Sequence, residues 1–261
     1  MKPGTYLISR RDMISAGIAG IGTTMLSSCL KLKPVDGPPQ DVDPIVTAIV
    51  AAPTGTVATG LSVPVSGQFE EAFLYVPSGY QASTPTPLVL MFHAENETAF
   101  AAVSLFRPYA DAAGIALLAI DSATTTWDAF ANGSFGPDVD FMNSALSATF
   151  KVLNVDPTRI AVEGYSEGGG YAIAVARANG DFFSHAISFS AAFVPGTTPV
   201  GKPKFFLAQG IDDVTVDITE TGDVLSANLV SEGYTVDYLR YNGGHAPTTD
   251  AIQQAIAWLA A

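Results

Sequence analysis

The sequence predicts an α/β protein built around an open, mostly parallel β-sheet with helices on both faces. Short apolar runs alternate with longer helical stretches, the order expected when helices connect parallel strands. The runs LVLMF at 88–92, IALLAI at 115–120 and KFFLA at 204–208 are apolar almost throughout, as in strands covered on both faces. A chain of 261 residues, 48% of them hydrophobic, is long enough to bury such a core.

The expected strands follow the apolar runs, and the expected helices occupy the stretches between them. Strands are predicted at residues 72–76, 88–93, 115–120, 160–163, 186–189, 204–208 and 235–241. Helices are predicted at 98–113, 139–153, 168–178, 219–231 and 248–260. Repeated prolines between residues 54 and 67 allow an edge strand there but not a central one, because proline cannot donate to a sheet ladder.

The first 28 residues have the organisation of an export signal. A basic pair precedes a mildly apolar Gly/Ala/Ile run and then small residues. Residues 9–14, SRRDMI, resemble a twin-arginine signal. Residues 26–29, LSSC, resemble a bacterial lipobox, in which the cysteine becomes the lipidated first residue. We therefore predict a signal peptide at 1–28 and lipidation of Cys29. The alternative is an uncleaved membrane anchor, although the apolar run is short and diluted by Gly, Ser and Thr.

Composition then divides the rest of the chain into a tether and a domain. Residues 31–44, KLKPVDGPPQDVDP, combine Pro, Gly and charges without an apolar period, so residues 29–53 are predicted to be a tether and 54–261 the folded domain. The net charge of −13, with few and scattered basic residues, excludes a nucleic-acid-binding surface. The same charge means that electrostatic attraction to anionic lipids would not hold the protein at a membrane. The acyl groups would have to hold the protein to a membrane of the bacterial envelope. Neither the leaflet nor the oligomeric state is predicted.

The single cysteine excludes intramolecular disulfides, a cysteine-based zinc site and an iron–sulfur cluster. Nucleotide-binding motifs and metal-ligand spacings are not found in the sequence. We therefore expect neither a metal nor a cofactor.

A candidate nucleophile, Ser166, lies where a strand is predicted to turn into a helix. Residues 164–168 read G-Y-S-E-G after the run RIAVE and before YAIAVARA. A strained turn that exposes a serine hydroxyl leaves no room for side chains two residues to either side, which explains the glycines. The helix that follows directs its amides toward a developing oxyanion. The alternative is a Gly-rich turn without chemistry.

A nucleophilic serine needs a base and an acid that orients the base. Hydrolases built on this kind of sheet carry them in the order Ser, Asp or Glu, His. Of the three histidines, only His245, in the loop YNGGHAP after the last predicted strand, follows a candidate acid that itself follows Ser166. Two acids, Asp212 and Asp213, follow the strand at 204–208, and the residues alone leave both open. His93 is expected to brace its loop and His185 to be structural.

The chain from about residue 70 to 261 resembles the α/β-hydrolase family of secreted polyhydroxybutyrate-depolymerase-like and feruloyl-esterase-like enzymes. The resemblance rests on VDPTRIAVEGYSEGGG, on PDVDF at 137–141 and on the GGHAP loop, in order and spacing. It implies an α/β-hydrolase fold. In that family the acid loop reads G-x-x-D-x-x-V, which here runs from Gly210 through Asp213 to Val216, so the resemblance favours Asp213 over Asp212.

The oxyanion hole needs two backbone amides, one of them from Glu167, the residue after the nucleophile. The second should come from the loop after the strand that ends near His93, from Glu95 or else from Ala94. The family has His-Gly there, whereas this chain has His93-Ala94-Glu95. Two glutamates beside a developing negative charge would oppose it unless they turn outward.

Aromatic residues near this edge are candidate walls of the substrate site. Trp127 follows the strand at 115–120, and Tyr165 precedes the nucleophile, with Phe130 close to Trp127 in sequence. We expect Trp127 and Tyr165 to contact substrate, although aromatic residues are commonly core residues instead. The segment from 121 to 137 is too short for a large lid, so an open cleft is expected.

Taken together, the residues and the resemblance predict an exported, lipid-anchored serine hydrolase that cleaves carboxylic esters through an acyl-enzyme. The resemblance implies feruloyl or acetyl esters of polysaccharide, or short polyhydroxyalkanoates, and does not choose among them. One alternative is a weakly active or inactive binding lipoprotein that keeps the fold. Another is an intracellular thioesterase whose N-terminus only resembles a signal.

Overall fold

The computed structural model describes residues 36–39, 43–68 and 70–260. The predicted signal peptide and Cys29 lie outside these residues. Within the described part of the chain, no helix combines the length and the apolar character that crossing a membrane requires.

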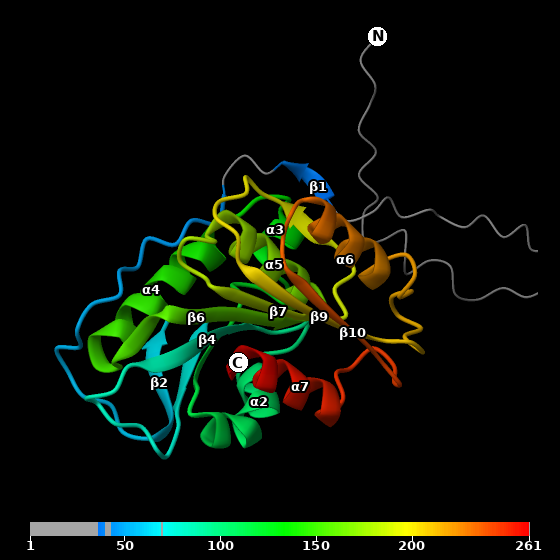
Figure 1. Cartoon of the computed structure of the whole chain (residues 1–261). Helices are drawn as coiled ribbons and strands as arrows, with labels where there is room; N and C mark the ends of the chain where they lie inside the picture. The colour runs from blue at the N-terminus through cyan, green and yellow to red at the C-terminus, as the bar shows by residue number, and fades with distance from the viewer. Residues whose placement is uncertain (1–35, 40–42, 69, 261) are drawn as a thin grey trace, which may run out of the picture. The chain divides into compact units, whose positions relative to one another are not determined.

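An eight-stranded sheet forms the centre of the domain (Figure 1), in the order β10-β9-β7-β6-β4-β5-β3-β2. From β5 to β10 all neighbouring strands are parallel, while β3 runs antiparallel to both β5 and β2. The strands are β2 Gly60–Ser66, β3 Glu71–Val76, β4 Thr86–Phe92, β5 Ala116–Ile120, β6 Val155–Tyr165, β7 His185–Phe189, β9 Lys204–Gly210 and β10 Val236–Tyr241. The predicted mostly parallel sheet is thus confirmed, with β2 as the edge strand that the prolines allowed.

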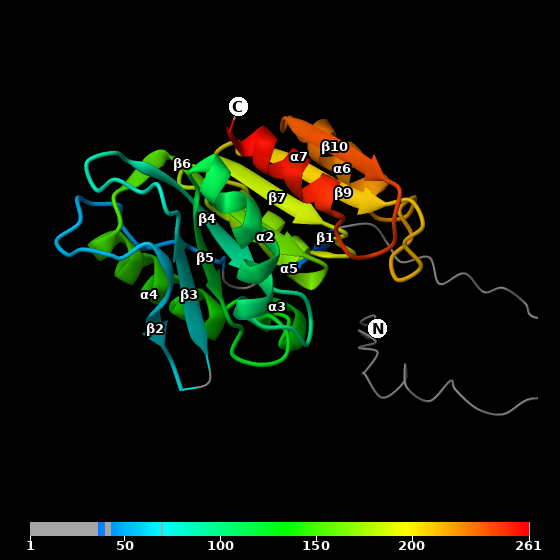
Figure 2. The same ribbon diagram turned by 90° about the horizontal axis from the view of Figure 1, so that it is seen from below.

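Helices cover both faces of the sheet. In Figure 1, α4 (Pro137–Val152), α5 (Glu167–Ala178) and α6 (Gly222–Ser231) lie above the strands. Figure 2 shows the other face, on which α2 (Ala99–Ala113) and α7 (Thr249–Ala260) lie side by side. All five predicted helices are present and differ from their predicted ranges by three residues or fewer at either end. The structure adds the four-residue helix α3 (Asp128–Ala131) and a small parallel pair of β1 (Asp36–Pro39) with β8 (Val194–Gly196).

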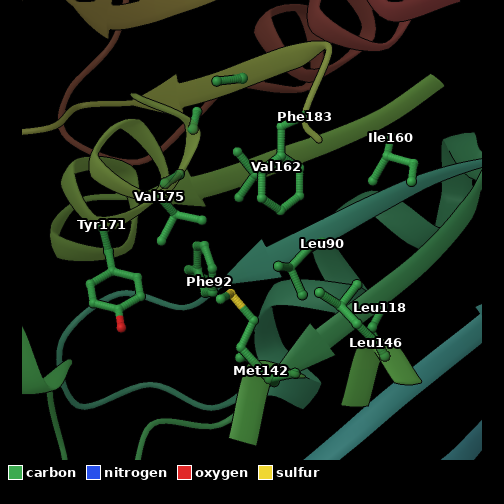
Figure 3. Packing of buried hydrophobic residues seen from close by; sticks show 14 of the residues in the cluster. Leu90, Phe92, Leu118, Met142, Leu146, Ile160, Val162, Tyr171, Val175 and Phe183 are labelled. Carbon is green, nitrogen blue, oxygen red and sulfur yellow. The ribbon is translucent and has the colours of Figure 1, made fainter. Parts of the chain in front are cut away.

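Each face of the sheet has its own hydrophobic cluster. One cluster fills the space under α4, α5 and α6, and Figure 3 shows its closely packed side chains from Leu90, Leu118 and Val162 on the strands to Met142 and Val175 on the helices. The other cluster, under α2 and α7, takes the alternate strand positions such as Val89, Met91 and Ala161. Because both faces are buried, the central strands need apolar residues at every position. Burial on both faces therefore explains the continuous apolar runs from which the sheet was predicted.

Residues 43–53, which the sequence assigns to the tether, make specific contacts with the domain. The Val46 amide donates to Asn179 Oδ1 at 2.8 Å, and Asn179 Nδ2 donates to the Pro44 carbonyl at 2.7 Å. Asn143 on α4 accepts hydrogen bonds from the amides of Thr47 and Ala48. The buried Asn179 and the partly buried Asn143 therefore hold this segment against α4 and α5, and the ordered domain includes it.

Candidate active site

Ser166 lies at the sharp junction of β6 and α5. Its φ of 56° and ψ of −120° belong to neither a strand nor a helix and are rarely adopted by a side-chain-bearing residue. A Cβ on Gly164 would lie 2.0 Å from the Gly168 carbonyl oxygen, and one on Gly168 would lie 2.3 Å from the Phe92 carbonyl oxygen. These contacts are impossible for real atoms. The two glycines thus allow the turn to close and the start of α5 to pack against the end of β4.

His245 hydrogen bonds to this serine, and Asp213 hydrogen bonds to His245. His245 Nε2 lies 2.9 Å from Ser166 Oγ, and His245 Nδ1 lies 2.8 Å from Asp213 Oδ2. Since a carboxylate only accepts, Nδ1 carries the proton and Nε2 is left to accept the serine proton. The serine, the acid and the histidine follow the carboxyl ends of β6, β9 and β10, respectively. The structure therefore joins residues up to 79 positions apart into one hydrogen-bonded series.

The structure also distinguishes the two adjacent acids. Asp213 is buried, and its Oδ1 accepts from the amides of Thr215 and Val216, both at 2.9 Å, while Oδ2 faces His245. Asp212 is exposed, and its amide donates to the Gly243 carbonyl. Successive side chains in this turn point in different directions, so only Asp213 reaches the base.

Two residues that support the base were not identified from the sequence. Gln209, buried at the end of β9, donates from Nε2 to the Val216 carbonyl at 2.8 Å and so helps to close the acid loop. Ser190, which follows β7, donates from Oγ to the His245 carbonyl at 2.7 Å. Their only sequence signal is a polar residue at the carboxyl end of an apolar strand.

The loop after β4 is held from within by His93. This ring is 2% exposed. Its Nδ1 lies 2.7 Å from the Ala94 carbonyl and its Nε2 accepts from the Ser122 amide at 3.0 Å. Burial lowers the pKa of His93, which suits a neutral ring that donates at one nitrogen and accepts at the other. His93 thus has the bracing position expected from the sequence, next to Ala94 and Glu95. Glu95 itself is half-buried in that loop.

Trp127 does not form a wall of an open cleft, contrary to the prediction. Its side chain is fully buried, stacked on Tyr171 and in edge contact with Phe92. Its Nε1 donates to the His93 carbonyl at 2.9 Å. Packing against α5 draws the ring inward. Tyr165, by contrast, is partly exposed, and its ring centre lies 5.2 Å from that of His245.

A small cavity lies between α2 and the ends of β4 and β6, with room for about one water molecule. Tyr165, Glu97, Phe106 and Glu163 are among its lining residues. Glu163 is 2% exposed, and none of the described residues donates a hydrogen bond to its carboxyl group. Burial raises the pKa of Glu163 well above its usual range. The sequence analysis gave this acid no attention, because it lies within a strand.

Among the described residues, no group of three or more His, Cys, Asp or Glu side chains is arranged to hold a metal ion.

The sequence matches no protein-family model and no curated protein. The structure, however, resembles many solved structures. It superposes on a thermostable esterase with a TM-score of 0.59 and 19% identity, covering 73% of this chain and 58% of that one. It superposes on the fluorophosphonate-binding serine hydrolase FphF of Staphylococcus aureus with a TM-score of 0.61 and 16% identity, covering 74% and 92%.

A further similar structure is the S-formylglutathione hydrolase FrmB of Staphylococcus aureus, with a TM-score of 0.59, 16% identity, and 81% and 100% of the two chains covered. At sequence identities of 16–19%, the similarity is one of fold. Together with the strand order and the crossing helices, it shows that the protein has the α/β-hydrolase fold.

Proposed function

We propose that the protein is a serine hydrolase that cleaves carboxylic esters. One observation carries the proposal: Ser166, His245 and Asp213 form an unbroken hydrogen-bonded series, with separations of 2.9 and 2.8 Å. The position of the serine on a strained strand-to-helix turn supports the same chemistry. The thermostable esterase among the similar structures adds weight to esters as substrates.

The geometry gives each residue a role in two half-reactions. His245 Nε2 takes the proton of Ser166 as Oγ attacks the ester carbonyl carbon, and Asp213 stabilises the imidazolium that forms. The alcohol then leaves with the proton from Nε2, and an acyl-enzyme remains on Oγ. Water attacks this ester with His245 again as base, and releases the acid. The Glu167 amide and one from Ala94–Glu95 bind the oxyanion in this scheme.

The finer features of the function also belong to this proposal. The twin-arginine-like pair and the lipobox-like sequence support export and a lipid on Cys29. Feruloyl or acetyl esters of polysaccharide and short polyhydroxyalkanoates remain the substrate classes that the sequence resemblance implies. A binding lipoprotein without activity is less consistent with three aligned catalytic groups than an enzyme is.

A fluorophosphonate tests the proposal directly, since it reacts readily with the activated serine of a serine hydrolase. Purified full-length protein should gain the mass of one adduct, and S166A should gain none. The same label applied to membrane and soluble fractions should follow the membrane in wild type and leave it in C29A. Folded wild-type protein that forms no adduct would contradict the hydrolase proposal. A panel of acetyl, butyryl and feruloyl esters then ranks the substrates.

A further inference from the structure

One short segment contacts both halves of the predicted oxyanion hole. Residues 122–127, SATTTW, connect β5 to α3, and we name them the bridging segment. On one side, Ser122 and Trp127 hydrogen bond to His93, and the Thr125 carbonyl accepts from the Asn96 amide at 2.7 Å. His93 and Asn96 are the residues on either side of Ala94–Glu95, so the segment holds both ends of that loop.

On the other side, the bridging segment holds Glu167. The buried Thr126 hydroxyl donates a hydrogen bond to Glu167 Oε2. Glu167 is the first residue of α5, and its amide is the donor expected directly after the nucleophile. A hydroxyl bonded to a carboxylate makes a strong, charge-assisted contact. Thr126 thus fixes the side chain of Glu167, whose backbone amide has to point at the oxyanion.

The segment itself is stiffened by its own hydroxyl groups. Ser122 Oγ donates to the Thr124 carbonyl at 2.6 Å, and Thr124 Oγ1 donates to the Thr126 carbonyl at 2.8 Å. Both of its ends are tied to one buried acid, because the amides of Ala123 and of Asp128, directly after the segment, donate to the two oxygens of Asp138. A segment with these internal and external bonds is able to hold two other loops at a set separation.

We propose that the bridging segment sets the spacing of the oxyanion hole and that Thr126 is a positioning residue acting through the Glu167 carboxylate. The contact does two things for the reaction. It keeps the Glu167 backbone from rotating about the start of α5, and it engages a negative charge that would otherwise oppose the oxyanion. This inference rests on the proposed ester hydrolysis and adds a residue to it.

Replacing Thr126 tests the proposal, with turnover on an activated acetyl ester as the first readout. T126V keeps the shape of the side chain and removes the hydroxyl. We expect kcat to fall about 10-fold with KM changed less than about 3-fold, since an oxyanion contact acts on the transition state. T126S retains the hydroxyl and should restore most of kcat. Affinity for a boronic acid that mimics the tetrahedral intermediate should fall in parallel with kcat.

A matched control separates this role from a general effect of losing a buried hydroxyl. Thr149 on α4 is fully buried, and its Oγ1 has no partner among the described residues, so T149V makes the same chemical change within the α4 core. It should leave kcat unchanged. If Thr126 acts through Glu167, T126V should lose most of its effect in an E167A background, where the carboxylate is absent and the amide remains.

The outcomes separate this inference from the function on which it rests. Wild-type protein without a fluorophosphonate adduct overturns both. Wild-type protein that is labelled and active, with T126V turning over as fast, overturns the positioning role alone. So does a T126V defect that persists undiminished in E167A, or one that T126S fails to rescue.

Discussion

The two sides of Ser166 are built in different ways. On the base side, side chains reach one another directly, from Ser166 to His245 to Asp213. On the oxyanion side, the groups expected to bind the oxyanion are backbone amides, and other residues, above all Thr126 and Trp127, hold the loops that carry them. A motif identifies residues by their side chains. It therefore describes the base side well and says little about the oxyanion side.

The same contrast extends to two buried acids. Asp138, beneath the bridging segment, accepts backbone hydrogen bonds from Ala123 at 2.7 Å and Asp128 at 2.6 Å. Glu163, three residues before the nucleophile, has no donor among the described residues. The first acid organises a loop, whereas the second lines a water-sized cavity. Their substitutions should accordingly have different consequences.

The largest effect should come from the acid on the base side. D213N removes the charge that stabilises the imidazolium and offers a donor where an acceptor is needed, so kcat should fall on the order of 10³- to 10⁴-fold in steady-state ester hydrolysis. D212N is the matched control, one residue away and exposed. It should change kcat less than about 2-fold, because its side chain does not meet His245. A greater loss in D212N than in D213N would contradict the assignment.

A smaller effect on activity is expected from D138N, on the oxyanion side. Asparagine cannot accept two amides as the carboxylate does, so the bridging segment should loosen and kcat should fall by up to about 10-fold. Burial, together with the negative charge of Asp128, raises the pKa of Asp138 to about 6. Because the folded pKa exceeds the unfolded one, this acid stabilises the fold most below pH 4, and the stabilisation is lost as pH rises to about 6.

Urea unfolding at several pH values measures that contribution. The stability difference between wild type and D138N should be greatest at pH 4 and should shrink toward pH 7, where both curves become parallel. A difference that stays constant from pH 4 to pH 7 would show that Asp138 does not titrate in this range.

The smallest effect on activity should come from E163Q. The raised pKa of Glu163 means that its neutral form is favoured in the folded state, so wild-type stability falls as pH rises above the unfolded value. Glutamine mimics the neutral acid. E163Q should match wild type in stability at pH 4, exceed it at pH 8, and leave kcat unchanged. Thermal unfolding of both proteins at the two pH values tests this prediction. If E163Q is less stable than wild type at pH 8, the ionised carboxylate of Glu163 stabilises the fold, contrary to the prediction.

The sequence by itself determined the order of the elements and the candidates for nucleophile and base. Apolar runs and helical stretches arise from neighbouring residues, so the predicted strands and helices agree with the structure to within a few residues, except that β6 begins five residues earlier, at Val155. Ser166 and His245 were recognised for a similar reason, because each lies among glycines at a predicted strand end. The loop at Ala94–Glu95 was likewise predicted from its position directly after a predicted strand.

Only the tertiary structure decided which way individual side chains point. It placed Asp213 rather than Asp212 against the base, drew Trp127 into the core, and brought Gln209 and Ser190 to the acid and base loops. It also packed residues 43–53 on α4 and α5. Each of these depends on contacts between residues far apart in the chain, or on the turn of a loop. Local patterns of hydrophobicity carry no information about either.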